Sequence, residues 1–302
     1  MLRAYVRSFG VTFLVLVLGI GATNLIIDPF GLRGGWRPAL GQDDFAIRRD
    51  YRLFKLARFA RVPSANIILG DSRSDNLREE LFEKHGAHYA NLAFGGGTAF
   101  EAIDAFWFAS GHSALKNVVL GVPFNLYSER NDMNLVPAAI AQLRNPEGHY
   151  LSLSILALSG SIVASKVRGT GAPTEAPPMS EAAFWDHQLL ESAAFYEVWT
   201  EPTSLRRRLA DVVDYCRTHA INLYFYIPPA HVDLMRRVHD FGLDEQYATY
   251  KKELLSFGVP VFDFDVENDF TRGRANFTDP YHLKPEKQRV VVDEMFARGL
   301  RH

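Results

Sequence analysis

Short apolar runs alternate with longer amphipathic segments along most of this chain. The runs are bounded by glycine or polar residues, which is typical of buried parallel strands. We expect strands at 66–70, 89–92, 117–123, 221–227 and 259–264. Segments with helical periodicity separate them, and we expect helices at 50–61, 75–85, 98–110, 204–219 and 285–300. This alternation predicts an α/β fold, a three-layer α/β/α sandwich around a mainly parallel five-stranded sheet.

The N-terminal segment follows a different pattern. Residues 8–27 carry no charge and are strongly apolar, which is enough to cross a bilayer that needs about 20 residues. We therefore expect a membrane anchor at residues 1–30, and a cleaved signal peptide is the alternative. Arg3 and Arg7 favour a cytoplasmic N-terminus, but Arg33 and Arg37 follow the span, so charge alone leaves the orientation open.

The rest of the chain divides at turn-rich segments. Residues 31–62 read as a juxtamembrane linker and helix, and residues 63–302 as the main domain. A helical insertion at about 134–200 should form a cap beside the functional site. A second membrane segment within residues 150–167 is the alternative, and residues 168–178 read as an exposed loop rich in glycine and proline.

Composition removes some classes of function. The formal charge of -2 and the absence of a Lys/Arg run argue against a nucleic-acid partner. Cys216 is the single cysteine, so the chain forms no internal disulfide and no cysteine-based metal site. Its amphipathic surroundings predict a buried structural thiol.

Candidate chemistry follows the predicted strands, because sites in open parallel sheets lie beyond the strands' carboxyl ends. Gly70-Asp71-Ser72 places a hydroxyl at a strand-to-helix turn, a suitable position for a nucleophile. The alternative is that Asp71 or Ser72 only caps the next helix. After the second strand, the glycine run that includes Gly95 and Gly96 allows backbone amides to approach an oxyanion, or forms a plain turn.

Near the C-terminus, Asp279 precedes His282 by three residues in a turn-rich loop. A carboxylate can orient a histidine that acts as a general base, although the same spacing also occurs in surface turns. His231 follows the fourth strand and so faces the same edge of the sheet, as a substrate contact or as part of a proline-held turn.

Together the Gly-Asp-Ser, glycine-run and Asp-x-x-His segments resemble the SGNH hydrolase superfamily, also called GDSL-like, over about residues 66–302. The resemblance implies a flavodoxin-like strand order, Ser72 as nucleophile, His282 as general base and Asp279 as its orienting acid. It also implies oxyanion donors from the amides of Ser72 and of Gly95 or Gly96, and no cofactor or metal.

One segment departs from the family's pattern. SGNH proteins commonly carry Gly-x-Asn-Asp after the third strand, whereas here Asn125 follows Gly121 and Asn131-Asp132 comes later. Asn125 is the candidate third oxyanion donor, and a turn-forming asparagine is the alternative.

An anchored domain of this type resembles bacterial cell-surface acyl-transfer proteins, including alginate O-acetylation proteins and the DltD family. This implies an extracytoplasmic domain on the inner membrane, O-acetyl transfer to a polysaccharide, and a membrane acyl-donor partner. Asp71, Arg73 and His231 are expected to contact substrate. An esterase, a noncatalytic glycan-binding protein and a metal-dependent phosphoesterase remain the alternatives.

Overall fold

The computed structural model describes residues 2–33, 43–171 and 179–302. Residues 34–42 of the expected linker and 172–178 of the expected loop lie outside these ranges. The chain forms two compact units. The N-terminal unit comprises Met1–Val62 and Leu135–Ala176, and the sheet unit comprises Pro63–Asn134 and Pro177–His302.

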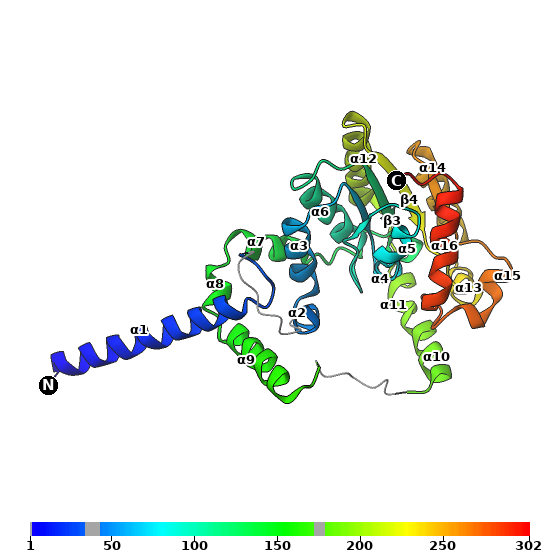
Figure 1. Cartoon of the computed structure of the whole chain (residues 1–302). Helices are drawn as coiled ribbons and strands as arrows, with labels where there is room; N and C mark the ends of the chain where they lie inside the picture. The colour runs from blue at the N-terminus through cyan, green and yellow to red at the C-terminus, as the bar shows by residue number, and fades with distance from the viewer. Residues whose placement is uncertain (1, 34–42, 172–178) are drawn as a thin grey trace. The chain divides into compact units, whose positions relative to one another are not determined.

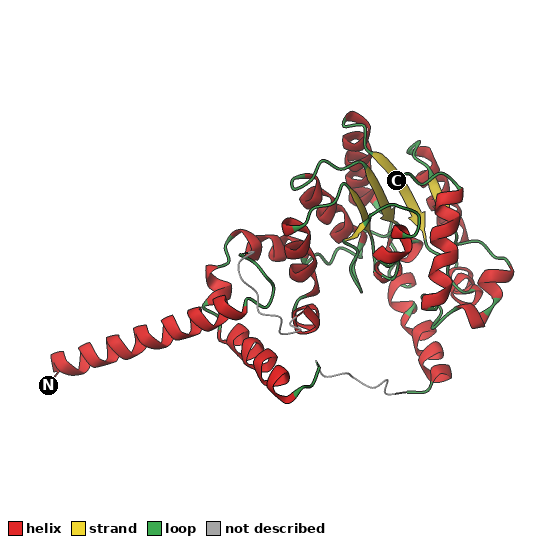
Figure 2. Ribbon diagram, viewed as in Figure 1, coloured by secondary structure: helices red, strands yellow, loops and turns green. Residues whose placement is uncertain are grey.

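The sheet unit contains five parallel strands in the order β2-β1-β3-β4-β5. The strands are β1 (Asn66–Leu69), β2 (Ala90–Asn91), β3 (Asn117–Gly121), β4 (Asn222–Ile227) and β5 (Val261–Asp263). Figure 2 shows them at the centre of this unit with helices on both sides. The predicted α/β class, the parallel sheet and the flavodoxin-like order are confirmed.

Register and side-chain alternation give the sheet two buried faces. Ile67 of β1 pairs with Val118 of β3, and Val118 pairs with Leu223 of β4. Neighbouring residues point to the opposite face, where Ile68, Val119 and Tyr224 join one core cluster with side chains of helices α5 (Glu79–Glu83) and α16 (Pro285–Ala297). Helices α6 (Ala99–Ser110) and α12 (Thr203–Thr218) pack against the other face. Both faces are covered, which explains why the strands are almost continuously apolar.

The helices of this unit connect the strands (Figure 1). They are α4 (Ser72–Asp75), α5 (Glu79–Glu83), α6 (Ala99–Ser110), α10 (Glu181–Glu191), α11 (Ala193–Tyr196), α12 (Thr203–Thr218), α13 (Val232–Asp240), α14 (Asp244–Ser256), α15 (Asp269–Arg272) and α16 (Pro285–Ala297), with 3-10 turns at Phe124–Leu126 and Arg274–Asn276. Two of them, α10 and α11, come from the insertion and are called the cap below.

The helix expected at 75–85 is wrong in its bounds. Asp71 is the N-cap of α4, so this helix begins at Ser72, directly after β1. It ends at Asp75, and a second helix, α5, begins at Glu79. The earlier start brings Ser72 into the first turn of a helix.

The N-terminal unit is helical. It consists of α1 (Leu2–Ile27), α2 (Asp43–Arg49), α3 (Tyr51–Arg61), α7 (Val136–Arg144), α8 (Glu147–Tyr150) and α9 (Leu153–Arg168). Among the described helices, α1 is the one long and apolar enough to cross a membrane. Its last turns dock onto the unit because Asn24 donates to the carbonyls of Tyr150 and Ser152, at 2.7 and 3.0 Å, and accepts from Ser159.

The expected insertion at 134–200 divides between the two units. Helices α7, α8 and α9 pack with the N-terminal helices, whereas α10 and α11 belong to the sheet unit. The apolar residues of α9 thus include a face that packs within its own unit, through Ile155 and Ile162.

Candidate active site

Ser72 lies at the carboxyl edge of the sheet, in the turn that connects β1 to α4. The Asp71 side chain accepts a hydrogen bond from the Arg73 amide at 3.1 Å and caps the helix. Gly70 has a φ of +140°, and a Cβ there would lie 2.4 Å from the Ser74 hydroxyl. Only glycine fits this turn, which is why the residue before Asp71-Ser72 is a glycine.

The loop before α16 holds Asp279 and His282 in a fixed geometry. Its base is closed by a bridge between Phe277 and Leu283 and by a 2.8 Å bond from the Thr278 amide to the His282 carbonyl. The Asp279 carboxylate accepts bonds from the amides of Tyr281 and His282, at 2.9 and 3.1 Å. These bonds hold the carboxylate beside Nδ1 of the His282 imidazole.

The structure brings the three expected triad residues into one hydrogen-bonded series. The Ser72 Oγ lies 2.7 Å from Nε2 of His282, and Nδ1 of His282 lies 2.9 and 2.8 Å from the two oxygens of Asp279. A carboxylate only accepts hydrogen bonds, so Nδ1 carries the proton and Nε2 is free to accept the Ser72 proton. Asp279 is 7% exposed and His282 25% exposed, so the imidazole is reachable from solvent while the carboxylate is shielded.

Arg73 forms a buried ion pair beside the serine. Its Nε and Nη2 lie 2.8 and 2.6 Å from Oδ2 of Asp71, and Nη2 also donates to Oδ1 of Asn125 at 2.6 Å. Burial opposes the charge of Arg73, but the neighbouring Asp71 carboxylate outweighs it, and the pKa of Arg73 is raised. Asp71 and Arg73, expected to contact substrate, are thus largely occupied with each other and with Asn125.

Asn125 is oriented by these contacts. Because Oδ1 accepts from Arg73, Nδ2 points the other way, and it donates to no acceptor within the described residues. The Asn131 side chain donates to the Asn125 carbonyl at 2.7 Å and holds the backbone of this turn. Of the displaced Asn131-Asp132 pair noted in the sequence, Asn131 therefore supports the Asn125 turn from six residues away.

Two other groups supply candidate oxyanion amides. The Ser72 amide lies in the first turn of α4, where helical geometry leaves it without an intrahelical acceptor. Gly96, with a φ of +63°, and Gly97 line the cavity above Ser72, whereas Gly95 is not among its lining residues. Gly96 is therefore the better placed of the two glycines expected from the sequence. The Gly97 amide is already used, because it donates to the Phe94 carbonyl at 2.8 Å.

A cavity of about 590 Å³ opens over the serine and histidine. Its walls combine apolar and polar side chains from the β2–α6 turn, the segment after β3, the cap and the triad loop. Sequence reasoning missed the lining residues Leu126, Arg130, Met133, Gln188, Phe195 and Tyr281. They sit in irregular segments and in the short helices of the cap, where no spacing pattern marks a residue as facing the site.

His231 does not line this cavity. It caps α13, accepts from the Asp233 amide at 3.1 Å, and its ring packs edge-on against Trp185 and Phe277. It is 4% exposed, because the Ile227-Pro-Pro turn directs it into the packing between the cap and the triad loop. The structure therefore gives it a supporting place behind Asp279 and His282, not a contact with the cavity.

No protein-family model matches this chain, and no curated protein sequence is similar to it. Among solved structures, the chain is similar to a Bacteroides fragilis protein described as a "putative acylhydrolase". The two are 13% identical, the alignment covers 83% of this chain and 99% of the other, and the TM-score is 0.43.

Proposed function

We propose that this chain is a serine-dependent acyl-transfer enzyme that forms an acyl-enzyme on Ser72. The observation that carries the proposal is the hydrogen-bonded series from Ser72 through His282 to Asp279. In the first step His282 takes the Ser72 proton as Oγ attacks the acyl carbonyl, and Asp279 stabilises the imidazolium that forms. His282 then returns the proton to the leaving oxygen, which departs as an alcohol.

The tetrahedral intermediate carries a negative oxygen that needs fixed donors. The Ser72 amide, the Gly96 amide and Nδ2 of Asn125 are the candidate donors, and Arg73 holds the Asn125 amide in the required orientation. Donors that are already oriented need no rearrangement as the charge develops, which is the main source of their effect on rate.

We propose O-acetyl transfer to a hydroxyl of a cell-envelope or secreted polysaccharide as the second half of the reaction. His282 would remove the proton from the acceptor hydroxyl as its oxygen attacks the acyl carbonyl, and would then return the proton to the Ser72 oxygen as the acyl–Ser72 bond breaks. The cavity supports an extended acceptor because it is larger than an acetyl group needs and its wall includes Arg130, Asn131 and Gln188. The apolar helix α1 supports anchoring in the inner membrane with the sheet unit outside the cytoplasm. A membrane protein would then donate the acyl group.

Hydrolysis is the second candidate, and one observation favours it. Ser72 and His282 are partly exposed, so water can reach the acyl-enzyme as readily as a sugar hydroxyl. The same residues would then perform an esterase reaction, because both reactions share the first step.

The test measures acetate release from p-nitrophenyl acetate by the full chain in detergent, with and without polysaccharide acceptors. Wild type should turn over, and Ser72→Ala and His282→Ala should not. Acetylated acceptor would favour the transferase, and release unaffected by acceptors would favour the esterase. A folded wild-type chain that shows no turnover and no Ser72 adduct with a fluorophosphonate would overturn the catalytic proposal.

A further inference from the structure

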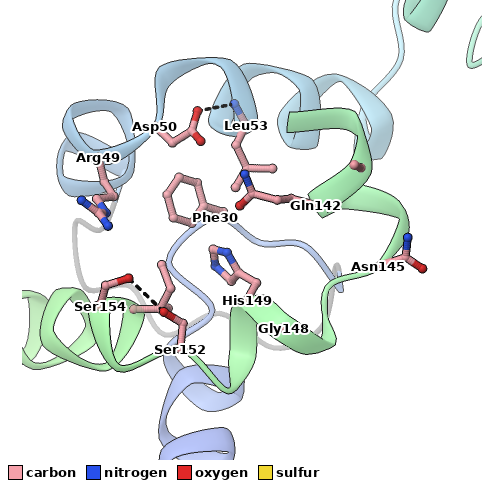
Figure 3. Close-up of a pocket in the computed structure, with 12 residues that line it drawn as sticks. Phe30, Arg49, Asp50, Leu53, Gln142, Asn145, Gly148, His149, Ser152 and Ser154 are labelled. Carbon is pink, nitrogen blue, oxygen red and sulfur yellow. Dashed lines mark hydrogen bonds between the residues drawn. The ribbon is translucent and has the colours of Figure 1, made fainter. Parts of the chain in front are cut away.

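The N-terminal unit contains a second cavity, of about 640 Å³, lined entirely by its own residues (Figure 3). It begins three residues after the end of α1, at Phe30, and is lined by the α2–α3 junction, α7, the α7–α8 turn, α8 and the start of α9. Its polar lining residues are Arg49, Asp50, Gln142, Asn145, His149, Ser152 and Ser154. None of the lining residues is shared with the cavity over Ser72.

The N-terminus of α9 opens into this cavity. Ser152 precedes the helix, but its hydroxyl bonds to the Ser154 hydroxyl at 2.9 Å and caps no amide. The first helical bond runs from the Leu156 amide to the Ser152 carbonyl at 3.0 Å. The amides of the first helical turn therefore have no intrahelical acceptor, and the helix dipole adds a partial positive charge at this wall.

His149 is an independent sign of a ligand. It is 8% exposed, and its Nε2 is buried without a hydrogen-bond partner among the described residues. Figure 3 shows the imidazole reaching from α8 toward the middle of the lining residues, beneath Phe30, with which it packs edge-on. Burial lowers the pKa of His149, so near neutral pH the ring is uncharged and still offers one N–H. A buried polar atom without a partner costs free energy that a bound ligand would remove.

Arg49 supplies the positive charge. It ends α2 at the cavity wall, is exposed, and makes no ion pair within the described part of the chain. Asp50 also lines the cavity, but its carboxylate accepts from the Leu53 amide at 2.9 Å and so serves as the cap of α3. The Arg49 guanidinium is therefore available to bind a ligand, whereas the Asp50 carboxylate already accepts the hydrogen bond that caps α3.

We propose that this cavity binds a phosphate group, held by Arg49, His149 and the first-turn amides of α9. Guanidinium groups and helix N-termini are the groups that proteins commonly use for phosphate. Two sources share this chemistry, the head group of a membrane lipid and a soluble phosphate. The position beside the end of α1 suits a lipid head group if that helix spans the bilayer.

Calorimetric titration of the full chain in phosphate-free detergent buffer tests the proposal. One arm uses inorganic phosphate and the other uses dioctanoyl phosphatidic acid, which carries the same group on a lipid. We expect binding in at least one arm, and at least tenfold tighter binding of the lipid would assign the head group as the source. Equal or weaker binding of the lipid would assign soluble phosphate. No heat of binding at millimolar concentration in either arm would overturn the proposal.

Two variants and one control locate the binding. Arg49→Gln should weaken binding about tenfold or more, because it removes a charged hydrogen bond. Ser154→Asp should abolish binding by placing a carboxylate at the α9 N-terminus, where it stabilises the helix and so preserves the fold. Arg48→Gln removes an exposed charge one residue away that does not line the cavity. Equal weakening by Arg48→Gln and Arg49→Gln, or unchanged binding in Ser154→Asp, would overturn the proposal.

Discussion

The Nη2 of Arg73 lies 2.6 Å from Oδ1 of Asn125, and this contact fixes the direction of the Asn125 amide group. The same guanidinium is held by Asp71, one residue before the proposed nucleophile. The chain thus couples the turn that carries Ser72 to the turn that carries the candidate oxyanion donor. In the proposed reaction Arg73 is a positioning residue, and Asn125 touches the reacting oxygen.

Arg73→Lys should lower kcat about tenfold and leave KM nearly unchanged. A lysine keeps the charge beside Asp71 but cannot donate to Asp71 and Asn125 together with the planar geometry of a guanidinium. Asn125→Ala should cost about 10²–10³ in kcat, the usual effect of losing one oxyanion donor. In the Asn125→Ala background, Arg73→Lys should have little further effect. Equal losses in both backgrounds would show that Arg73 does not act through Asn125, and thermal melting of each variant checks that it is folded.

Asp279→Asn should lower kcat by roughly 10³–10⁴ without unfolding the loop. The asparagine can keep one contact to Nδ1 but favours the wrong tautomer, so Nε2 no longer accepts the Ser72 proton. Because the three residues act as a unit, Ser72→Ala combined with Asp279→Asn should cost no more than Ser72→Ala alone. Steady-state turnover of p-nitrophenyl acetate by the single and double variants measures these losses. Asp269→Asn, at a fully exposed aspartate, is the control and should retain wild-type rates.

Gly121→Ala should destabilise the chain by about 1–3 kcal/mol, because the added methyl has no room. Its Cβ would lie 2.1 Å from the Ser74 hydroxyl, which is itself buried without a hydrogen-bond partner among the described residues. Ser74→Ala should therefore be neutral or stabilising, and it should restore most of the stability of Gly121→Ala. Urea unfolding of the two single variants and the double variant measures the coupling. Purely additive effects would contradict this packing arrangement.

The sheet could be predicted from the sequence because both of its faces are buried, so β1, β3 and β4 are short apolar runs with clear ends. Ser72 could be predicted from a motif directly after β1, and Asp279 and His282 from a short motif in the loop before α16. The place of His231 could not be predicted, because the direction of a side chain after Pro228-Pro229 depends on the packing of Trp185 from the cap.

The division of the 134–200 insertion between the two units could not be predicted from the sequence for a similar reason. The apolar residues of α9 do not reveal that Ser159 pairs with Asn24, more than a hundred residues earlier. With this contact α9 belongs to the N-terminal unit, whereas α10 and α11 belong to the sheet unit. Hydrophobic periodicity identifies a buried face, but it does not identify the partner that buries it.

The single cysteine makes the orientation of the anchor measurable. Cys216 is buried in α12, and burial raises the pKa of its thiol to about 12, so the folded chain should not react with maleimides. A cysteine introduced at an exposed position is then the one reactive thiol. Asp269→Cys places it on the sheet unit, and Arg3→Cys places it at the start of α1.

In intact bacterial cells that express these variants, a maleimide that crosses the outer membrane but not the inner membrane should label Asp269→Cys and should not label Arg3→Cys. Disrupting the inner membrane should make Arg3→Cys reactive, while the parent chain should remain unlabelled until it is denatured. This pattern follows from α1 crossing the membrane with its start in the cytoplasm. Labelling of Arg3→Cys but not Asp269→Cys in intact cells would reverse the orientation. The proposed acyl acceptor would then have to be a cytoplasmic molecule, because Ser72 and Asp269 belong to the same unit.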